Sequence, residues 1–200
     1  MKQGKIIALL AGAVVLLTGG YLALRLKNAE KTKQKQEQEA PVSLISFDGD
    51  ATASLTVQNE EGTFRFLFQN QTWVLDGDEF TANPYTVSAI CSYMCNLSSV
   101  KTIAKDVTDL SPYGLSDPVE LTAVTDSGDS YQLLVGNPTP TNESYYAMLP
   151  GTTTVYTIDY TSGSVFRANK NTLKNRYLLD AYSTEITEFS LERDGKLIYS

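Results

Sequence analysis

The sequence predicts an α+β domain of antiparallel sheet meanders with one main packed helix, preceded by a single transmembrane helix. Three observations carry this prediction: an apolar run at residues 6–26, period-two alternation with Asp-Gly turns from residue 42 onward, and helical periodicity over residues 83–97. We therefore divide the chain into a tail (1–5), an anchor (6–26), a charged linker (27–41), an α+β domain (42–182) and a final segment (183–200).

The apolar run at residues 6–26 has the length of a membrane-spanning helix. It holds a single charge, Arg25, close to its end. At about 1.5 Å of rise per residue it would extend roughly 32 Å, enough to cross a hydrocarbon core of about 30 Å. The run is longer than a signal-peptide core, no Ala-x-Ala precedes a plausible cleavage point, and no cysteine at its end could take a lipid. We expect an uncleaved signal anchor that tethers the rest of the chain to a membrane.

The flanks of this run leave the orientation of the domain open. The C-terminal flank carries more Lys and Arg than the N-terminal flank, which by the positive-inside rule places the domain in the cytoplasm. The short N-terminal tail and the signal-like layout favour the opposite orientation. So does a domain that is rich in Tyr, Thr, Ser and Asn and poor in Lys. We expect an extracytoplasmic domain.

Charge and composition exclude several classes of function. Residues 1–40 hold seven Lys and Arg against three Glu, a balance of +4, and the remainder holds nine against twenty, a balance of −11, which together give the chain's −7. So acidic a domain repels phosphates, and nucleic acid is not an expected partner. The chain has no histidine, which excludes a Ser–His–Asp triad, a Cys–His pair and His-containing zinc sites.

The first half of the domain shows strand signals followed by a helix. Alternating strands joined by Gly turns predict an antiparallel meander at 53–57, 63–68 and 71–75, with a short strand at 79–81. Asn83-Pro84 predicts the start of a helix of about fifteen residues, with Asn as N-cap and Pro at the first helical position. One face of that helix is expected to pack on the sheet, through Val87, Ile90, Cys91, Met94 and Leu97.

The second half returns to strands. Gly136-Asn137-Pro138 predicts a break into a polar loop. The other expected elements are strands at 100–104, 119–125 and 130–135, a hairpin of 144–149 with 154–159, and one or two short helices within 165–179.

The last residues repeat an earlier pattern. Two alternating strands joined by a Gly turn at 187–199 resemble residues 53–66, with one residue skipped before the glycine. Such hairpins also recur by chance in β proteins, so both explanations stay open. Taken as a repeat, the likeness marks the start of a second tandem unit near residue 183 that stops inside its first hairpin.

Several motifs resemble a known family. Trp73-Val-Leu, then a helix, then Tyr113-Gly114-Leu115-Ser-Asp-Pro118 resembles the W-x-L … Y-G-L-x-x-P layout of the bacterial domain-of-unknown-function family numbered 4340. Leu134-Val-Gly136 and Tyr145-Tyr146 match its later strands. The resemblance runs from about residue 42 to the end of the sequence.

The resemblance implies a membrane-tethered accessory protein. Proteins of that family are similar in having an N-terminal membrane or lipid anchor and tandem α+β units. Some members of the family are associated with ABC-transporter components of the gliding-motility auxiliary type. The implied partner is therefore another envelope protein, with an ABC-transporter complex as one candidate. The resemblance carries over no catalytic residue and no cofactor.

The motif residues have a structural and a functional interpretation. Trp73 is expected in the core or on a sheet face rather than as a sugar-stacking platform. In the loop, Gly114 would supply a positive φ, Pro118 would rigidify the entry to a strand, and Tyr113 and Leu115 would pin the loop to the core. The alternative is a ligand-contacting loop, because loops on rigid scaffolds often carry binding residues.

Tyrosines in the second half of the chain offer a candidate partner surface. The expected aromatic stripe consists of Tyr145, Tyr146, Tyr156 and Tyr160. Alternation would leave some of them facing outward, where Tyr is enriched in interfaces. Strand packing explains them equally well.

Acidic and thiol side chains are the remaining candidates for chemistry. The acids at 48/50, 76/78/79 and 126/129 could bind calcium, but none has the spaced ligands of a twelve-residue calcium loop, so turn roles are expected. Cys91 and Cys95 are expected to pack in the core, with a redox or metal-binding pair as the alternative.

These observations predict a non-catalytic binding or accessory module without cofactor or metal. Two alternatives stay open. A cell-wall-directed hydrolase would need two carboxylates converging in one cleft. A small-ligand sensor would need a concave pocket with a few convergent polar groups.

Overall fold

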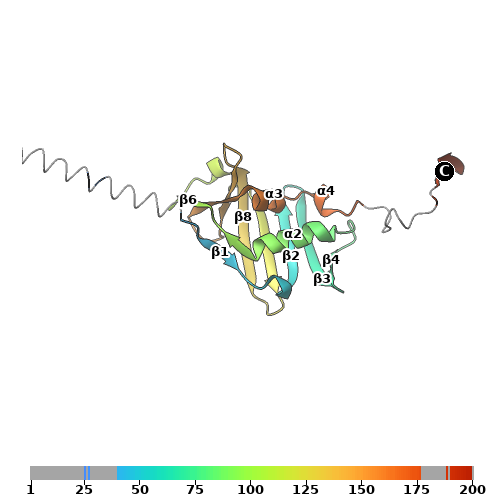
Figure 1. Ribbon diagram of the computed structural model, residues 1–200, viewed down its shortest axis with the longest axis horizontal. Coiled ribbons are helices and arrows are strands. Elements are labelled where there is room, and N and C mark those ends of the chain that lie inside the picture. Colours follow the sequence, from blue (N-terminus) through green and yellow to red (C-terminus); the bar gives the residue numbers. More distant parts are fainter. Residues whose placement is uncertain (1–24, 26, 28–39, 177–187, 189, 200) are drawn as a thin grey trace, which may run out of the picture.

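The computed structural model describes residues 25, 27, 40–176, 188 and 190–199. Its body is an eight-stranded sheet in the order β4-β3-β2-β7-β8-β9-β10-β6, in which every pairing is antiparallel. Helices cover one face of the sheet (Figure 1). The predicted α+β class, with a mostly antiparallel sheet and few helices, is confirmed.

The predicted meander forms one side of this sheet. Strands β2, β3 and β4 follow one another along the chain, and β7 then pairs with β2. The eight strands are β2 (Thr52–Asn59), β3 (Gly62–Gln69), β4 (Thr72–Leu75), β6 (Lys101–Ala104), β7 (Val119–Thr125), β8 (Ser130–Pro138), β9 (Ser144–Met148) and β10 (Val155–Asp159).

Period-two alternation places the apolar side chains on the inner face of the sheet. Leu55 lies opposite Phe66 on β3 and opposite Ala123 on β7. Val57 lies opposite Phe64 and Leu121 in the same way. All of these side chains are buried, since residues opposite one another in an antiparallel pair point to the same face.

Three helices and a small sheet cover the inner face. The helices are α2 (Pro84–Met94), α3 (Tyr160–Phe166) and α4 (Lys170–Leu173), and the small sheet pairs β1 (Ser43–Ser46) with β5 (Asn96–Ser98). Helix α2 begins as predicted, because the Asn83 side chain accepts hydrogen bonds from the backbone N–H groups of Tyr85 and Thr86. Its buried residues are Val87, Ile90, Cys91 and Met94.

The predicted length of α2 was wrong. The helix has 11 residues and ends at Met94, and Leu97 lies in β5 instead of on the last helical turn. Leu97 pairs with Ile45 of β1, and the Phe47 N–H donates to the Cys95 carbonyl at 2.9 Å. Leu97 is buried in the main core, as the helical spacing predicted, but its backbone belongs to a strand.

Three further boundaries differ from the sequence prediction. Strand β8 continues through residues 136–138, where a shift of register between Val135 and Pro138 admits the proline into the strand. Residues 79–81 form no strand, and Ala82 forms an isolated bridge with Lys174. Helix α3 begins at Tyr160 rather than at 165, because Asp159 caps it by accepting from the Ser162 N–H.

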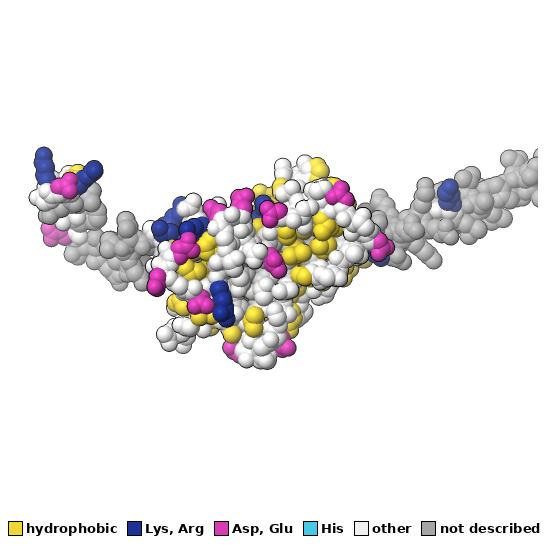
Figure 2. Space-filling view, turned by 180° about the vertical axis from the view of Figure 1, so that it is seen from behind, with side chains coloured by type: hydrophobic (Ala, Val, Ile, Leu, Met, Phe, Trp, Pro, Cys, Tyr) yellow, Lys and Arg dark blue, Asp and Glu magenta, His cyan; other side chains and the backbone are white. Residues whose placement is uncertain are grey.

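The outer face of the sheet is covered at one side only. The loop at residues 105–118 contains the short helix η2 (Ser111–Tyr113) and packs there, where Leu115, Met148 and Val155 form a second, smaller core. The remainder of the outer face carries half-buried or exposed polar side chains such as Thr56, Arg65 and Thr122. Figure 2 shows this side, with acidic side chains scattered over it.

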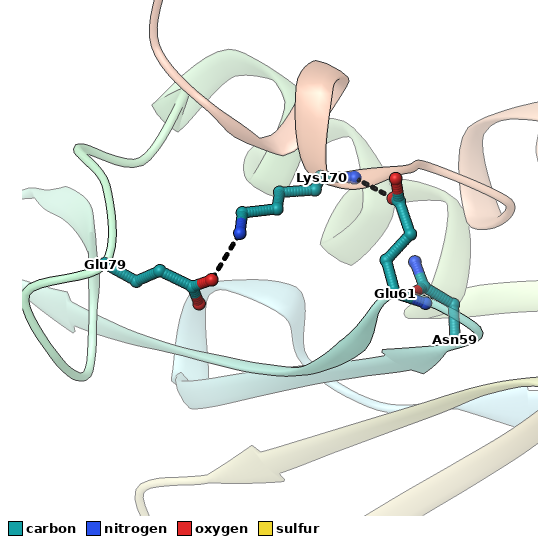
Figure 3. A network of polar contacts seen from close by, with 4 residues as sticks. All are labelled: Asn59, Glu61, Glu79 and Lys170. Atoms are coloured by element: carbon teal, nitrogen blue, oxygen red, sulfur yellow. Dashed lines mark hydrogen bonds and ion pairs between the residues drawn. The ribbon is translucent and has the colours of Figure 1, made fainter.

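A polar network fixes α4 across the end of the sheet. Figure 3 shows Lys170 between two acids: its backbone N–H donates to Glu61 at 2.6 Å, and its ammonium group pairs with Glu79. Asn59 donates to the Ala168 carbonyl at 3.0 Å. These contacts join the β2–β3 turn and the segment after β4 to the end of the helical layer.

The ends of the chain are described only in part. Residues 190–199 contain a two-stranded hairpin of β11 (Leu191–Arg193) and β12 (Lys196–Tyr199). The predicted anchor at 6–26 lies outside the described residues except for Arg25, as does most of the predicted linker. Within the part of the chain that the structure describes, no helix is both long and apolar enough to cross a membrane.

Candidate functional site

A cleft of about 530 Å³ lies at the β3–β4 side of the sheet in the described domain. Three elements form it: the turn before β2, the C-terminal half of α2, and the aromatic ends of β3 and β4. Its lining residues are Asp48, Gly49, Asp50, Thr52, Phe68, Trp73, Ser88, Cys91, Ser92 and Cys95. A volume of this size falls within the range of small-ligand sites, about 300–1,000 Å³.

Two aromatic rings form the apolar wall of this cleft. Phe68 lies opposite Trp73 across the β3–β4 pair, with ring centroids 5.2 Å apart and an interplanar angle of 56°. Trp73 is 6% exposed, whereas Phe68 is 45% exposed. Phe68 follows Phe64 and Phe66 on the same face of β3, but it is exposed whereas they are buried. Trp73 thus lies at the junction of core and cleft.

The short helix η1 (Gly49–Ala51) forms the acidic rim. Asp48 caps it by accepting from the Asp50 N–H at 3.1 Å, and both acids are exposed. Gly49 packs against α2: a Cβ atom at this position would lie 3.2 Å from the Cys95 sulfur. Among the described residues, neither Asp48 nor Asp50 forms a salt bridge, and no Lys or Arg lines the cleft.

Both cysteines are free thiols that line the floor of the cleft. Cys91 is buried, and its sulfur lies 3.2 Å from the Thr52 hydroxyl oxygen. Burial raises the pKa of Cys91, and the charges of Cys95 and Asp50 add to that increase while the Thr52 hydrogen bond opposes it. Cys95 is half-buried and donates to the Ser92 carbonyl at 3.3 Å. A raised pKa makes Cys91 a poor nucleophile at neutral pH.

The Tyr-Gly-Leu-x-x-Pro motif lies far from this cleft, on the outer face of the sheet. Gly114 has a φ of +67°, and Leu115 is buried in the smaller core. Tyr113 packs edge-on against Tyr146, with ring centroids 5.0 Å apart. Pro118 directly precedes β7 and is half-buried.

A close backbone approach joins this motif to β8. A Cβ atom at Gly136 would lie 2.1 Å from the Tyr113 carbonyl oxygen, and one at Gly114 would lie 2.4 Å from the Asn137 side chain. Glycine at both positions therefore lets the loop lie directly on the strand.

The four tyrosines of the expected stripe divide between the two faces of the sheet. Tyr145 lies opposite Ile158 on the inner face, and Tyr146 lies opposite Thr157 on the outer face. Tyr156 lies opposite Ala147 and therefore shares the inner face with Tyr145. Tyr160 begins α3, is 47% exposed, and packs on Tyr145 with ring centroids 5.5 Å apart. No single surface contains all four.

The acidic clusters lie at separate turns. Asp76 pairs with Arg65 at 3.3 Å, Glu79 pairs with Lys170, and Asp129 accepts from the Ser127 hydroxyl at 2.7 Å. In the described part of the chain, no three His, Cys, Asp or Glu side chains come together in a group that could hold a metal ion. Asp48 and Asp50 share the cleft but belong to one turn, so they do not face each other across it.

Sequence reasoning missed the cleft as a site, although it named several of its residues separately. Trp73, the cysteines and the acids at 48 and 50 were assigned to unrelated roles, and Phe68 and Ser88 were not singled out. The available signal was the alternating run Phe64, Phe66, Phe68, which puts three aromatic side chains on one face of a single strand.

This architecture defines an α+β domain with one main antiparallel sheet, which helices cover on its inner face and which carries an open cleft beside its edge strand. The chain belongs to the family described as domain of unknown function DUF4340, which matches residues 73–199. The match begins in β4 at Trp73 and extends to β12, so it includes both the Tyr-Gly-Leu-x-x-Pro loop and the final hairpin. No curated protein and no solved structure matches the chain.

Proposed function

We propose that the protein is a non-catalytic binding or accessory module of a bacterial envelope complex, tethered by residues 6–26 with its domain on the extracytoplasmic side. The observation that carries the binding role is the open, aromatic-walled cleft, in which the exposed acids Asp48 and Asp50 share a lining with the exposed ring of Phe68. The membrane tether rests on the length and apolar character of the 6–26 run.

The turn roles of the acids favour binding over hydrolysis. A glycosidase mechanism needs two carboxylates on opposite sides of the scissile bond. Asp48 and Asp50 lie on one turn, and the acids at 76, 79 and 129 are engaged elsewhere. A second candidate, a small-ligand sensor, is favoured by the volume of the same cleft.

The family membership suggests the kind of complex. The expected partner is another envelope protein, and an ABC-transporter complex is the first candidate because of the family resemblance. The β11–β12 hairpin, which falls within the family match, is further proposed to open a second tandem unit.

Two experiments test this function. Protease added to intact cells should digest the domain while a cytoplasmic control protein stays whole; an uncut domain would contradict the orientation. Affinity capture of the full chain from membranes, compared with residues 1–41 fused to an unrelated domain, should recover an envelope protein that the control does not. Recovery of the same proteins by both baits would contradict a binding role for the domain.

A further inference from the structure

We propose that the cleft beside β3 and β4 binds the side chain of a lysine or arginine presented by a partner protein. This inference rests on the proposed binding function and names the chemistry that the site recognises. It stands on three observations: an aromatic wall, an acidic rim that pairs with no Lys or Arg of the described residues, and an open mouth.

The aromatic wall provides a surface for an aliphatic stem and a cation. Phe68 leaves much of its ring exposed in the cleft, and the indole of Trp73 packs beside it with ring centroids 5.2 Å apart. A Lys or Arg side chain can lay its methylene groups along such rings, and its charged head interacts favourably with their faces. An anionic head would be repelled by the same faces.

The acidic rim favours a ligand group of positive charge. Asp48 and Asp50 are exposed at the cleft, and within the described residues no Lys or Arg side chain pairs with them. Elsewhere in the domain, Arg65 pairs with Asp76 and Lys170 pairs with Glu79. The cleft therefore carries an uncompensated negative charge beside an apolar wall, which complements a cation on an apolar stem.

The open mouth favours a side chain from a macromolecule over an engulfed small molecule. Small-ligand sites bury about 70–90% of their ligand. Here the rim residues Asp48, Asp50, Ser88 and Ser92 are all exposed to solvent. A single projecting side chain needs only such a half-open cleft, since the remainder of its chain contacts the surface around it.

Trp73 is the only tryptophan of the chain, so its fluorescence reports on this site directly. We would titrate the full chain, held in detergent micelles, with a capped Gly-Gly-Lys-Gly-Gly peptide to millimolar concentration. Matched peptides would carry norleucine, which keeps the apolar stem without the charge, or glutamate. The lysine peptide should shift Trp73 emission and bind about tenfold more tightly than the norleucine peptide.

Substitutions test whether the lysine peptide binds at the cleft. Asp50→Asn keeps the size of the side chain and should weaken lysine-peptide binding about fivefold, and Phe68→Ala should weaken it to a similar extent. Asp106→Asn, in the exposed turn after β6 at the opposite edge of the sheet from β4, is the matched control and should leave binding unchanged. Bound peptide should also slow alkylation of Cys95, which lines the same cleft.

Some results would overturn the inference. These are equal binding of the lysine and norleucine peptides, no effect of any peptide on Trp73 emission or Cys95 alkylation, or an equal loss in Asp106→Asn and Asp50→Asn. Binding of free alkylamines as tightly as the lysine peptide would instead indicate a small-molecule site and contradict a protein partner. If capture from membranes recovers a partner that Asp50→Asn and Phe68→Ala retain, the accessory role stands and only this site is wrong.

Discussion

Phe68 and Trp73 are directly opposite each other in the β3–β4 pair, and their ring centroids are 5.2 Å apart. Together they connect the core of the domain to its cleft. The two residues differ sharply in exposure, 45% for Phe68 and 6% for Trp73. One neighbouring pair of rings therefore serves both stability and the proposed binding site, and substitutions at its two members should separate these roles.

Trp73→Ala should lower the free energy of unfolding by about 3–5 kcal/mol, because it removes a large buried side chain and leaves a cavity. Phe68→Ala should lower it by only about 1 kcal/mol, since much of its ring is already in water. Urea unfolding followed by circular dichroism measures both values. Equal losses at the two positions would contradict the division of roles. Trp73→Phe, which keeps an aromatic ring, serves as the control.

Gly136→Ala should destabilise the domain by at least about 2 kcal/mol, because the new Cβ atom would lie within 2.1 Å of a backbone oxygen of Tyr113 and the loop must move. Gly128→Ala is the matched control. Gly128 has a φ of +89° but open space around its Cβ position, so alanine there should cost about 1 kcal/mol from backbone strain alone. Thermal unfolding of both variants makes the comparison. A smaller loss of stability in Gly136→Ala than in Gly128→Ala would mean that the loop is not in close contact with β8.

The two thiols should differ in reactivity. Burial raises the pKa of Cys91, whereas Cys95 is half-buried at the cleft, so Cys95 should react first with a thiol reagent at pH 8. Mass spectrometry of partially labelled protein identifies the modified site. Cys95→Ser should abolish the fast phase and Cys91→Ser the slow one. Faster labelling of Cys91 would contradict its burial.

The raised pKa of Cys91 also predicts a direction for stability against pH. The unfolded chain releases the Cys91 proton near the ordinary thiol pKa of 9.0, while the folded protein keeps it to higher pH. Between these values the folded state binds more protons, so its stability should fall as the pH rises above 9. Cys91→Ala should show a shallower decline than the parent protein over the same range. Parallel declines would show that other groups dominate.

The ion pair of Lys170 and Glu79 should contribute under about 1 kcal/mol, because both side chains are half-exposed and water screens their charges. A double-mutant cycle with Lys170→Met and Glu79→Gln isolates this coupling, and it should shrink in 1 M salt. Lys170→Met leaves the backbone hydrogen bond to Glu61 in place, so α4 should stay docked. A coupling above about 2 kcal/mol would mean that the pair is far less solvated than its exposure indicates.

Much of the strand pattern could be predicted because its cause is local. The alternation through Leu55 and Val57 fixes which side chains share a face, and Asn83-Pro84 sets the start of α2 through hydrogen bonds within one turn. Leu97 shows the limit of such reasoning. An apolar side chain at helical spacing is buried either way, and only its pairing with Ile45 of β1, distant in sequence, makes it a strand residue.

By itself, the sequence determined the α+β class, the apolar run at 6–26, the acidic character of the domain and the motifs of its family. These are properties of composition, periodicity and short segments. Only the tertiary structure brought Asp50, Phe68 and Trp73 to one cleft and paired Leu97 with Ile45 of β1. The physical reason is that a site depends on which strands pair and on where a covering helix ends. Both are decided by contacts between residues far apart along the chain, whose energies no local pattern contains.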